Sequence, residues 1–200
     1  MIASLQLLHG IWKSSYFVFS DHLPTESLNN LLNKFPELFH SYYQKLCQRK
    51  IGLTTVESED QNLFVSLLQT LSNLAIDYTF FFRQLSNYKV NRINSLSEFW
   101  NYYEKSEELI VWLSLYDQRL KRELSDDIKR SMEMKSVNPK YVLRNYIAQE
   151  VIEEVEKGGN EKLKNWLRIL YSPYAEHPEY ESYSKPTPIE KKNYSISCSS

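Results

Sequence analysis

Apolar side chains that recur every three or four residues constrain the fold of this chain more than any other feature. In residues 61–75 the recurring positions are Leu63, Leu67, Leu71 and Leu74. A second set consists of Leu109, Leu113, Tyr116, Leu120 and Leu124. Such spacing gathers apolar side chains on one face of a helix, and no segment alternates with period two for long enough to indicate a strand. The sequence therefore predicts an all-α fold, an irregular array of helices whose two apolar faces need partners, some of them from outside this chain.

Capping residues indicate where several of these helices begin. Ser58 precedes Gln61 by three residues, the spacing of a capping box. Asp77 is placed to cap a helix that ends near Leu85, because aspartate is a favoured N-cap residue. These signals predict two helices in succession, with a short turn between them.

A proline interrupts the longest predicted helix. The segment 25–49 reads as helical, but Pro36 lies inside it. Proline lacks the N–H that bonds to the preceding turn and clashes with that turn's carbonyl, so we expect a kink or a break near Phe35. Near the other end of the chain, a helix from Asn160 to Leu170 is predicted to stop before the next proline.

The capping signals are strongest for a helix that begins at Asn138 and ends before Gly158. Asparagine is a favoured N-cap, a proline follows in the first helical position, and glycine is common just beyond a helix end. Lys140 and Arg144 would then lie in the first two turns, where the helix dipole disfavours cations. Two interpretations follow: a carboxylate from a neighbouring helix neutralises Arg144, or this helix start contacts an anion or an acidic partner.

Composition excludes several classes of function. Only 4 of the 200 residues are glycine, and no glycine-rich loop is spaced to cradle phosphate. A formal net charge of −1 lacks the basic field that drives nucleic-acid binding. The uncharged stretch 61–76 is too short and too polar to span a membrane. Two cysteines are too few for a disulfide framework, which favours a reducing compartment, so we expect a cytoplasmic protein. From the charge and the uncharged stretch we expect no nucleic-acid or membrane partner.

The side chains that could act in catalysis or bind a metal ion lack the neighbouring residues that such a site requires. Glu37 and His40 have the spacing of one di-iron motif, but such sites need a second motif and two more carboxylates. Cys47 follows His40 by seven residues, which separates them by about 10 Å along a helix, too far for a nucleophile and its base. We therefore predict no catalytic, cofactor-binding or metal-binding residue in this chain.

The character of the sequence changes after residue 172. Residues 173–200 contain four prolines, almost no aliphatic residues, and tyrosines at positions 174, 180, 183 and 194. Such a segment cannot fold alone and is either disordered or extended along another surface, and its regular tyrosines favour the second alternative. We therefore predict a helical region over residues 1–172 and an extended tail over residues 173–200.

Four short motifs resemble a known family. They are RKIGL at 49–53, DYTFFFRQL at 77–85, VNPKYVLRNY at 137–146 and SCSS at 197–200. In this order and spacing they are similar to selenoprotein O, or SelO, a family of pseudokinase-fold protein adenylyltransferases. The resemblance covers about residues 40 to 200, while the first 40 residues fit only loosely.

The resemblance implies an activity that this chain does not carry by itself. Family members transfer AMP from ATP to hydroxyl side chains of proteins, and they use Mg²⁺ or Mn²⁺ bound in a kinase-like region upstream of everything matched here. The chain is thus expected to be the structural and regulatory C-terminal part of such an enzyme, inactive alone, with that catalytic region and its protein substrates as partners. The alternative is a stand-alone, non-catalytic helical interaction module derived from the family.

One site residue is implied by the resemblance. Cys198 is the third residue from the end, the position that holds selenocysteine in animal members and commonly cysteine in bacterial ones. Its implied role is redox-active, as a reversible disulfide with a cysteine in the catalytic region. Cys47 is a weaker partner, since a buried helical cysteine is usually inert.

Overall fold

The computed structural model describes residues 25–191, and within that range it confirms the all-α prediction. The elements in this range are α-helices and short 3₁₀ helices joined by turns, without a β-strand. The chain divides into two compact units, Met1–Leu46 and Cys47–Ser200. The predicted division after residue 172 stays a prediction, although residues 173–191 belong to the same unit as the helices from Asp60 onward.

Helix α2, Thr25–Lys50, is continuous through Pro36, so the helix does not break near Phe35, and the alternative of a kink there stays a prediction. An aromatic row crosses the proline turn on one side of the helix. The rings of Phe35 and Phe39 are 6.0 Å apart, and those of Phe39 and Tyr43 are also 6.0 Å apart. Side chains four residues apart meet on a helix surface, and these contacts support the turn that Pro36 deprives of a hydrogen bond.

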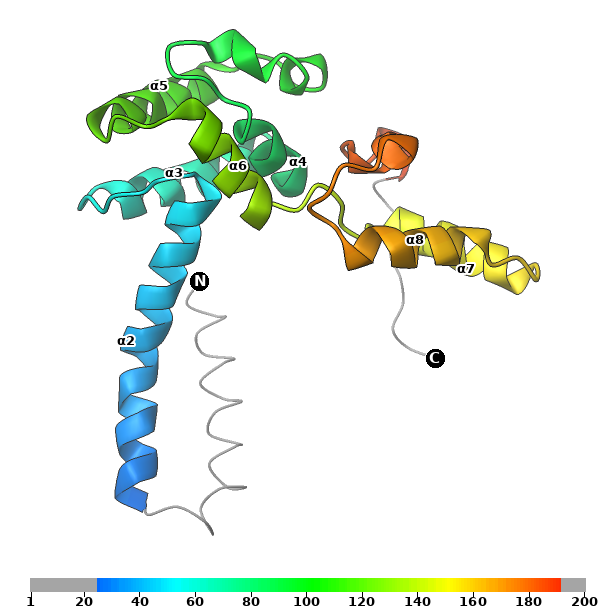
Figure 1. Cartoon of the computed structure of the whole chain (residues 1–200), viewed down its shortest axis with the longest axis horizontal. Coiled ribbons are helices and arrows are strands. Elements are labelled where there is room, and N and C mark those ends of the chain that lie inside the picture. Colours follow the sequence, from blue (N-terminus) through cyan, green and yellow to red (C-terminus); the bar gives the residue numbers. More distant parts are fainter. Residues whose placement is uncertain (1–24, 192–200) are drawn as a thin grey trace. The chain divides into compact units, whose positions relative to one another are not determined.

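The main core of the second unit forms where α3, Asp60–Asn73, packs against α5, Glu107–Arg122 (Figure 1). The two apolar faces predicted from the sequence thus cover one another. Helix α4, Tyr78–Leu85, is buried nearly all round, with Phe81 and Leu85 fully inaccessible. It packs against the 3₁₀ helix η2, Phe99–Asn101, which follows η1, Ile93–Leu96.

Helix starts follow the predicted capping at one site and depart from it at another. The Asp77 carboxylate accepts a hydrogen bond from the Phe80 N–H at 2.8 Å, which confirms its role as the cap of α4. The capping box at Ser58 is wrong, because α3 begins at Asp60 and has no side-chain cap. Asp60 instead accepts the N–H of Glu57 at 2.8 Å, and this bond shapes the preceding turn.

A predicted single helix over 138–157 is replaced by a helix end, an extended segment and a shorter helix. Helix α6 covers Asp127–Val137, and Asn138 follows it as C-cap with extended backbone angles. Helix α7 starts only at Asn145 and ends at Glu156. The predicted N-cap role of Asn138 is therefore wrong, whereas Gly158 does follow the helix in the left-handed region at φ +83°.

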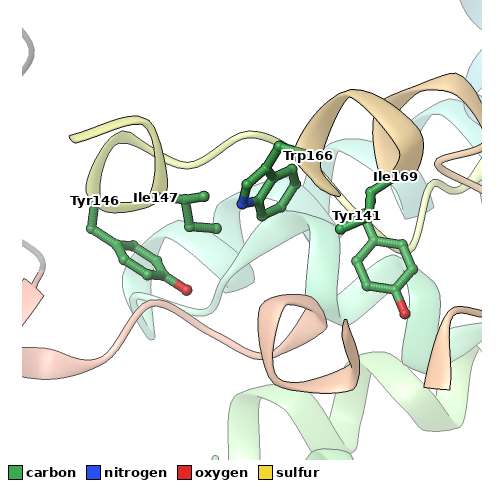
Figure 2. Packing of buried hydrophobic residues seen from close by; sticks show 5 residues of the cluster. All are labelled: Tyr141, Tyr146, Ile147, Trp166 and Ile169. Carbon is green, nitrogen blue, oxygen red and sulfur yellow. The ribbon is translucent and has the colours of Figure 1, made fainter. Parts of the chain in front are cut away.

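Helix α8, Glu161–Tyr171, starts after Asn160 as expected and runs beside α7 (Figure 1). Between them lies a second buried cluster (Figure 2). Its members are Tyr141, Tyr146, Ile147, Trp166 and Ile169. Tyr180 and Tyr183, from the chain after α8, pack against this cluster. Two tyrosines of the predicted tail thus contact a surface of the chain, as expected.

The described part of the tail is not simply extended. It forms two 3₁₀ helices, η3 over Pro178–Ser184 and η4 over Ile189–Lys191. The proline at the start of η3 restricts its own backbone to helix-compatible angles, and this favours a short helical turn over extended chain.

The turn after α2 explains one glycine of the sequence. Gly52 lies in the left-handed region at φ +71°. A Cβ added there would meet the Arg130 Cγ at 2.5 Å and the Met134 Sδ at 2.7 Å, both on α6. Glycine is therefore required at this position both by its backbone angles and by the close approach of α6.

Candidate functional site

The chain after α8 is held against the helices by ion pairs and hydrogen bonds that we call the tail junction. It comprises Asp77, Arg83, Lys140, Arg144, Glu176, Glu181 and Lys185. These residues are far apart in the sequence, and the fold brings them together where residues 173–185 pass α4 and the segment between α6 and α7.

Arg83, on α4, ties the end of α6 to the start of the tail. Its Nη1 donates hydrogen bonds to the carbonyl oxygens of Lys135 and Asn138, both at 3.1 Å. Its Nη2 donates to the carbonyl oxygen of Tyr174 at 3.1 Å and to the Glu176 carboxylate at 2.7 Å. The planar, multi-donor guanidinium suits this role, since lysine could not direct fixed donors to both sides.

Lys140 binds the tail through both its backbone and its side chain. Its N–H donates to the Pro173 carbonyl oxygen at 2.8 Å, and its ammonium forms ion pairs with Glu176 and Glu181. Although partial burial opposes the charged forms, these hydrogen bonds lower the pKa of both glutamates and raise the pKa of Lys140. All three groups are therefore charged at neutral pH.

Arg144 confirms one of the two interpretations offered for it, because a carboxylate of the same chain neutralises it. Its Nη2 lies 3.0 Å and 2.9 Å from the two carboxylate oxygens of Asp77, and its Nη1 donates to the Tyr183 carbonyl oxygen at 3.3 Å. The Tyr103 hydroxyl accepts the backbone N–H of Asp77 at 2.9 Å. Asp77 thus serves the start of α4 and the tail junction together.

Lys140 and Arg144 do not lie in the first turns of a helix. Lys140 precedes α7 and Arg144 is its N-cap residue, so the helix dipole gives no reason to expect an anion within a first turn at these positions. Both side chains face carboxylates of the same chain. Contact of either residue with an external partner stays a prediction.

Asn138 has a bridging role that the sequence did not indicate. It is fully buried, its amide donates to the Lys50 carbonyl oxygen at 2.8 Å, and the Lys50 ammonium donates back to its Oδ1 at 3.0 Å. The same ammonium lies 4.6 Å from the centre of the Phe82 ring. Burial lowers the pKa of Lys50 from its usual value. Asn138 therefore joins the end of α2 to the end of α6.

Two further lysines fasten the later part of the tail. Lys185 forms ion pairs with Glu98 and, at 2.6 Å, with Glu181. These pairs raise the pKa of Lys185 although burial opposes the charged form. At the last described position, Lys191 lies 2.6 Å from the Glu150 carboxylate on α7. The tail is thus fixed at intervals along its described length.

A serine–histidine contact and a cleft lie beside the tail junction. The Ser172 hydroxyl lies 3.1 Å from His177 Nε2, but the same nitrogen lies 3.2 Å from the Ser172 carbonyl oxygen. Within residues 25–191 no carboxylate orients that ring, as a nucleophile–base pair needs. A cleft of about 660 Å³ lies between the tail and the residues that precede α4, lined by Asp77, Tyr102, Tyr103, Tyr146 and Lys185 among others.

The side chains that could ligate a metal ion are scattered over the described residues. In that part of the chain, no three His, Cys, Asp or Glu side chains are grouped to hold a metal ion. His40 is exposed on α2, and Cys47 is buried as a thiol. No helix of the described part is long and apolar enough to cross a membrane. Cys198 lies outside the described residues.

Most of the tail junction was missed from the sequence. Arg83 stands within the DYTFFFRQL motif, and its position among buried aromatic residues was a usable signal. Arginine inside an otherwise apolar run must find acceptors when it is buried. Glu176, Glu181 and Lys185 carried no such signal, because charged residues in a polar tail are ordinary.

Comparison with known proteins accounts for these motifs. The model of a family described as "Protein adenylyltransferase SelO" matches residues 8–171. The chain belongs to the SelO family. The SelO match begins well before residue 40, so it extends further toward the N-terminus than the four motifs indicated.

The SelO relatives are much longer than this chain. It is 35% identical over 199 residues to the "Protein nucleotidyltransferase YdiU" of Vibrio cholerae, covering 96% of this chain and 40% of that protein. The protein of the same name from Aliivibrio salmonicida is 33% identical over 193 residues, which is 96% of this chain and 39% of that protein. The chain therefore spans about two fifths of the length of these curated SelO relatives.

Proposed function

We propose that this chain is the C-terminal structural and regulatory part of a SelO-family protein adenylyltransferase. The complete enzyme would transfer AMP from ATP to Ser, Thr or Tyr hydroxyls of proteins. The observation that carries the proposal is the pattern of coverage: nearly all of this chain matches only about two fifths of each relative. ATP and Mg²⁺ or Mn²⁺ would be bound in a kinase-like region outside this chain.

The regulatory part of the proposal concerns Cys198. The tail junction supports it, because the ion pairs fix the tail as far as Lys191, seven residues before this cysteine. An anchored tail delivers its terminal thiol to a limited region of space. The proposed chemistry is a disulfide between Cys198 and a cysteine of the catalytic region, formed when an oxidant such as hydrogen peroxide takes two electrons and two protons from the two thiols.

Two experiments test the proposal. The DNA upstream of codon 1 should encode a kinase-like region in frame, and the product of the joined frames should transfer labelled AMP to proteins with Mg²⁺ or Mn²⁺. This chain alone should leave itself and added proteins unlabelled, as a buffer blank does. A promoter and ribosome site directly before Met1 would favour the stand-alone interaction module instead, and AMP transfer by the chain alone would contradict the proposal.

A further inference from the structure

Helix α8 exposes a row of apolar side chains beside its buried face. Trp166 and Ile169 are buried, but the leucines of the same helix are exposed. The exposed row consists of Leu163, Leu167, Leu170 and Tyr171, with exposed fractions of 39%, 50%, 39% and 89%. Residues three and four apart lie on one helix face. We call this row the α8 stripe.

The face of α8 that lies next to the stripe packs against the rest of the chain. The Trp166 ring packs 5.1 Å from the Tyr183 ring, and Ile169 is fully inaccessible. Beyond the C-terminal end of α8, the Pro173 carbonyl oxygen accepts the Lys140 N–H at 2.8 Å. A partner that contacts the stripe would therefore have to order the exposed side chains of the stripe but not the helix backbone that carries them.

A second copy of this chain is a poor occupant of the stripe. Helix α8 carries three cations, of which Lys162 pairs with Glu150 of α7 and Lys164 lies 4.0 Å from Glu161. Arg168 has no ion pair among the described residues, and two copies packed stripe to stripe would bring their Arg168 side chains toward one another, a like-charge juxtaposition that is costly across an interface. A surface with an apolar centre and an acidic border fits the helix better.

We propose that the α8 stripe is the surface on which the catalytic region of the longer SelO-family protein docks, through an apolar patch bordered by acidic side chains. This inference rests on the proposed function. The relatives contain a further three fifths of their length beyond the part that this chain matches, so the family protein has a large body to cover the stripe. Burial of contiguous apolar side chains supplies the driving force.

The test compares thiol labelling at two positions in two proteins. Leu167→Cys places a thiol in the stripe, and Ser66→Cys places one at an exposed polar position of α3. Both variants lack the other cysteines. In this chain alone, maleimide should label both positions at similar rates. In the intact Vibrio cholerae relative, a cysteine at the position aligned with Leu167 should react at least about tenfold more slowly than one aligned with Ser66, because labelling then requires undocking.

The ratio of the labelling rates at the two positions tests the docking surface without any measurement of enzyme activity. A ratio near one in the intact relative, which folds without any joining of chains, overturns the docking surface even if the proposed function holds. If the stripe position is protected there but the DNA upstream of codon 1 encodes no kinase-like region, the docking surface stands for the family and the proposed function of this chain fails. As a second measurement, Leu167→Asp at the aligned position should lower the melting temperature of the intact relative. In this chain alone, where the site is exposed, the same change should have no effect.

Discussion

Nη2 of Arg144 donates hydrogen bonds to both carboxylate oxygens of Asp77, at 3.0 Å and 2.9 Å. The same carboxylate caps α4. One side chain therefore fixes a helix start and a neighbouring chain segment at once, and this shared use makes the pair the most informative target for mutation.

Arg144→Ala should destabilise the protein by about 3 kcal/mol, because the change leaves a partly buried carboxylate without its charge partner. Asp77→Asn is the matched variant, since asparagine is as good an N-cap as aspartate and removes only the charge. It should cost less than Arg144→Ala but more than the exposed control Arg168→Ala. Thermal melts would measure all three, and an unchanged melt for Arg144→Ala would favour the external-partner interpretation of this arginine.

Gly52→Ala should destabilise the protein by more than about 2 kcal/mol, since it combines a left-handed backbone with overlap of α6 side chains. Gly158→Ala is the matched control. Its backbone is also left-handed, but nothing lies within 4 Å of the added Cβ, so it should cost only about 1 kcal/mol. Chemical denaturation measures the free energy of unfolding of both variants. Equal losses would show that the α6 side chains can move away from the added Cβ at position 52.

The hold of the tail junction should depend on pH. The pKa values of Glu176 and Glu181 are lowered. The two carboxylates therefore stabilise the tail junction fully above about pH 4.5, and this stabilisation is lost as the pH falls through the lowered pKa values. The pKa values of Lys140 and Lys185 are raised. The two ammonium groups therefore stabilise the junction fully below about pH 10.5, and this stabilisation is lost as the pH rises through the raised pKa values. The junction should therefore be stable from about pH 5 to 10.

Hydrogen exchange at the Lys140 amide, which bonds to the Pro173 carbonyl oxygen, reports this hold. Its protection should be lost as the pH falls below 4.5 and through the lowered pKa values of Glu176 and Glu181, after correction for intrinsic exchange rates. A double variant, Glu176→Gln with Glu181→Gln, should show weak protection at every pH, while Glu156→Gln on the exposed end of α7 should behave as wild type. Protection that persists to pH 2 would show that hydrogen bonds alone hold the tail.

Alkylation should distinguish the two cysteines. In this chain alone iodoacetamide should modify Cys198 but not Cys47, because Cys47 is buried on α2. In the complete enzyme, oxidation should protect Cys198 and change the rate of AMP transfer, and Cys198→Ser should abolish that redox dependence. Mass spectrometry of alkylated peptides provides the measurement. If Cys198 is modified equally in oxidising and reducing buffers, with activity unchanged, its redox role is refuted.

The fold class and most helices could be predicted because they depend on local pattern. The three-four spacing at Leu63 and Leu109 indicates helices whatever surrounds them, and Asp77 caps α4 through a contact three residues away. The start of α7 could not be predicted in this way. Asn138 is a strong cap by type, yet its amide is occupied by Lys50, a residue 88 positions earlier in the chain.

The candidate site was less predictable for the same reason. A contact such as Arg83 with Tyr174 joins residues 91 apart, and no local rule connects them. At Leu124 the local pattern predicts too much rather than too little. It continues an apolar repeat, but α5 ends before it, and it lies in the left-handed region with its side chain exposed. Spacing identifies an apolar face, but only the packing of the whole chain decides where that face ends.

The anchor at Lys191 turns the end of the tail into a tether of known maximum length. Cys198 follows this lysine by seven residues, and an extended chain spans at most about 3.3–3.6 Å per residue. The backbone length alone therefore limits the separation of the Lys191 and Cys198 Cα atoms to about 25 Å, and the Glu150 ion pair fixes the Lys191 end of that span. While that ion pair holds, a cysteine of the catalytic region could form the proposed disulfide only if it lay within this reach of α7.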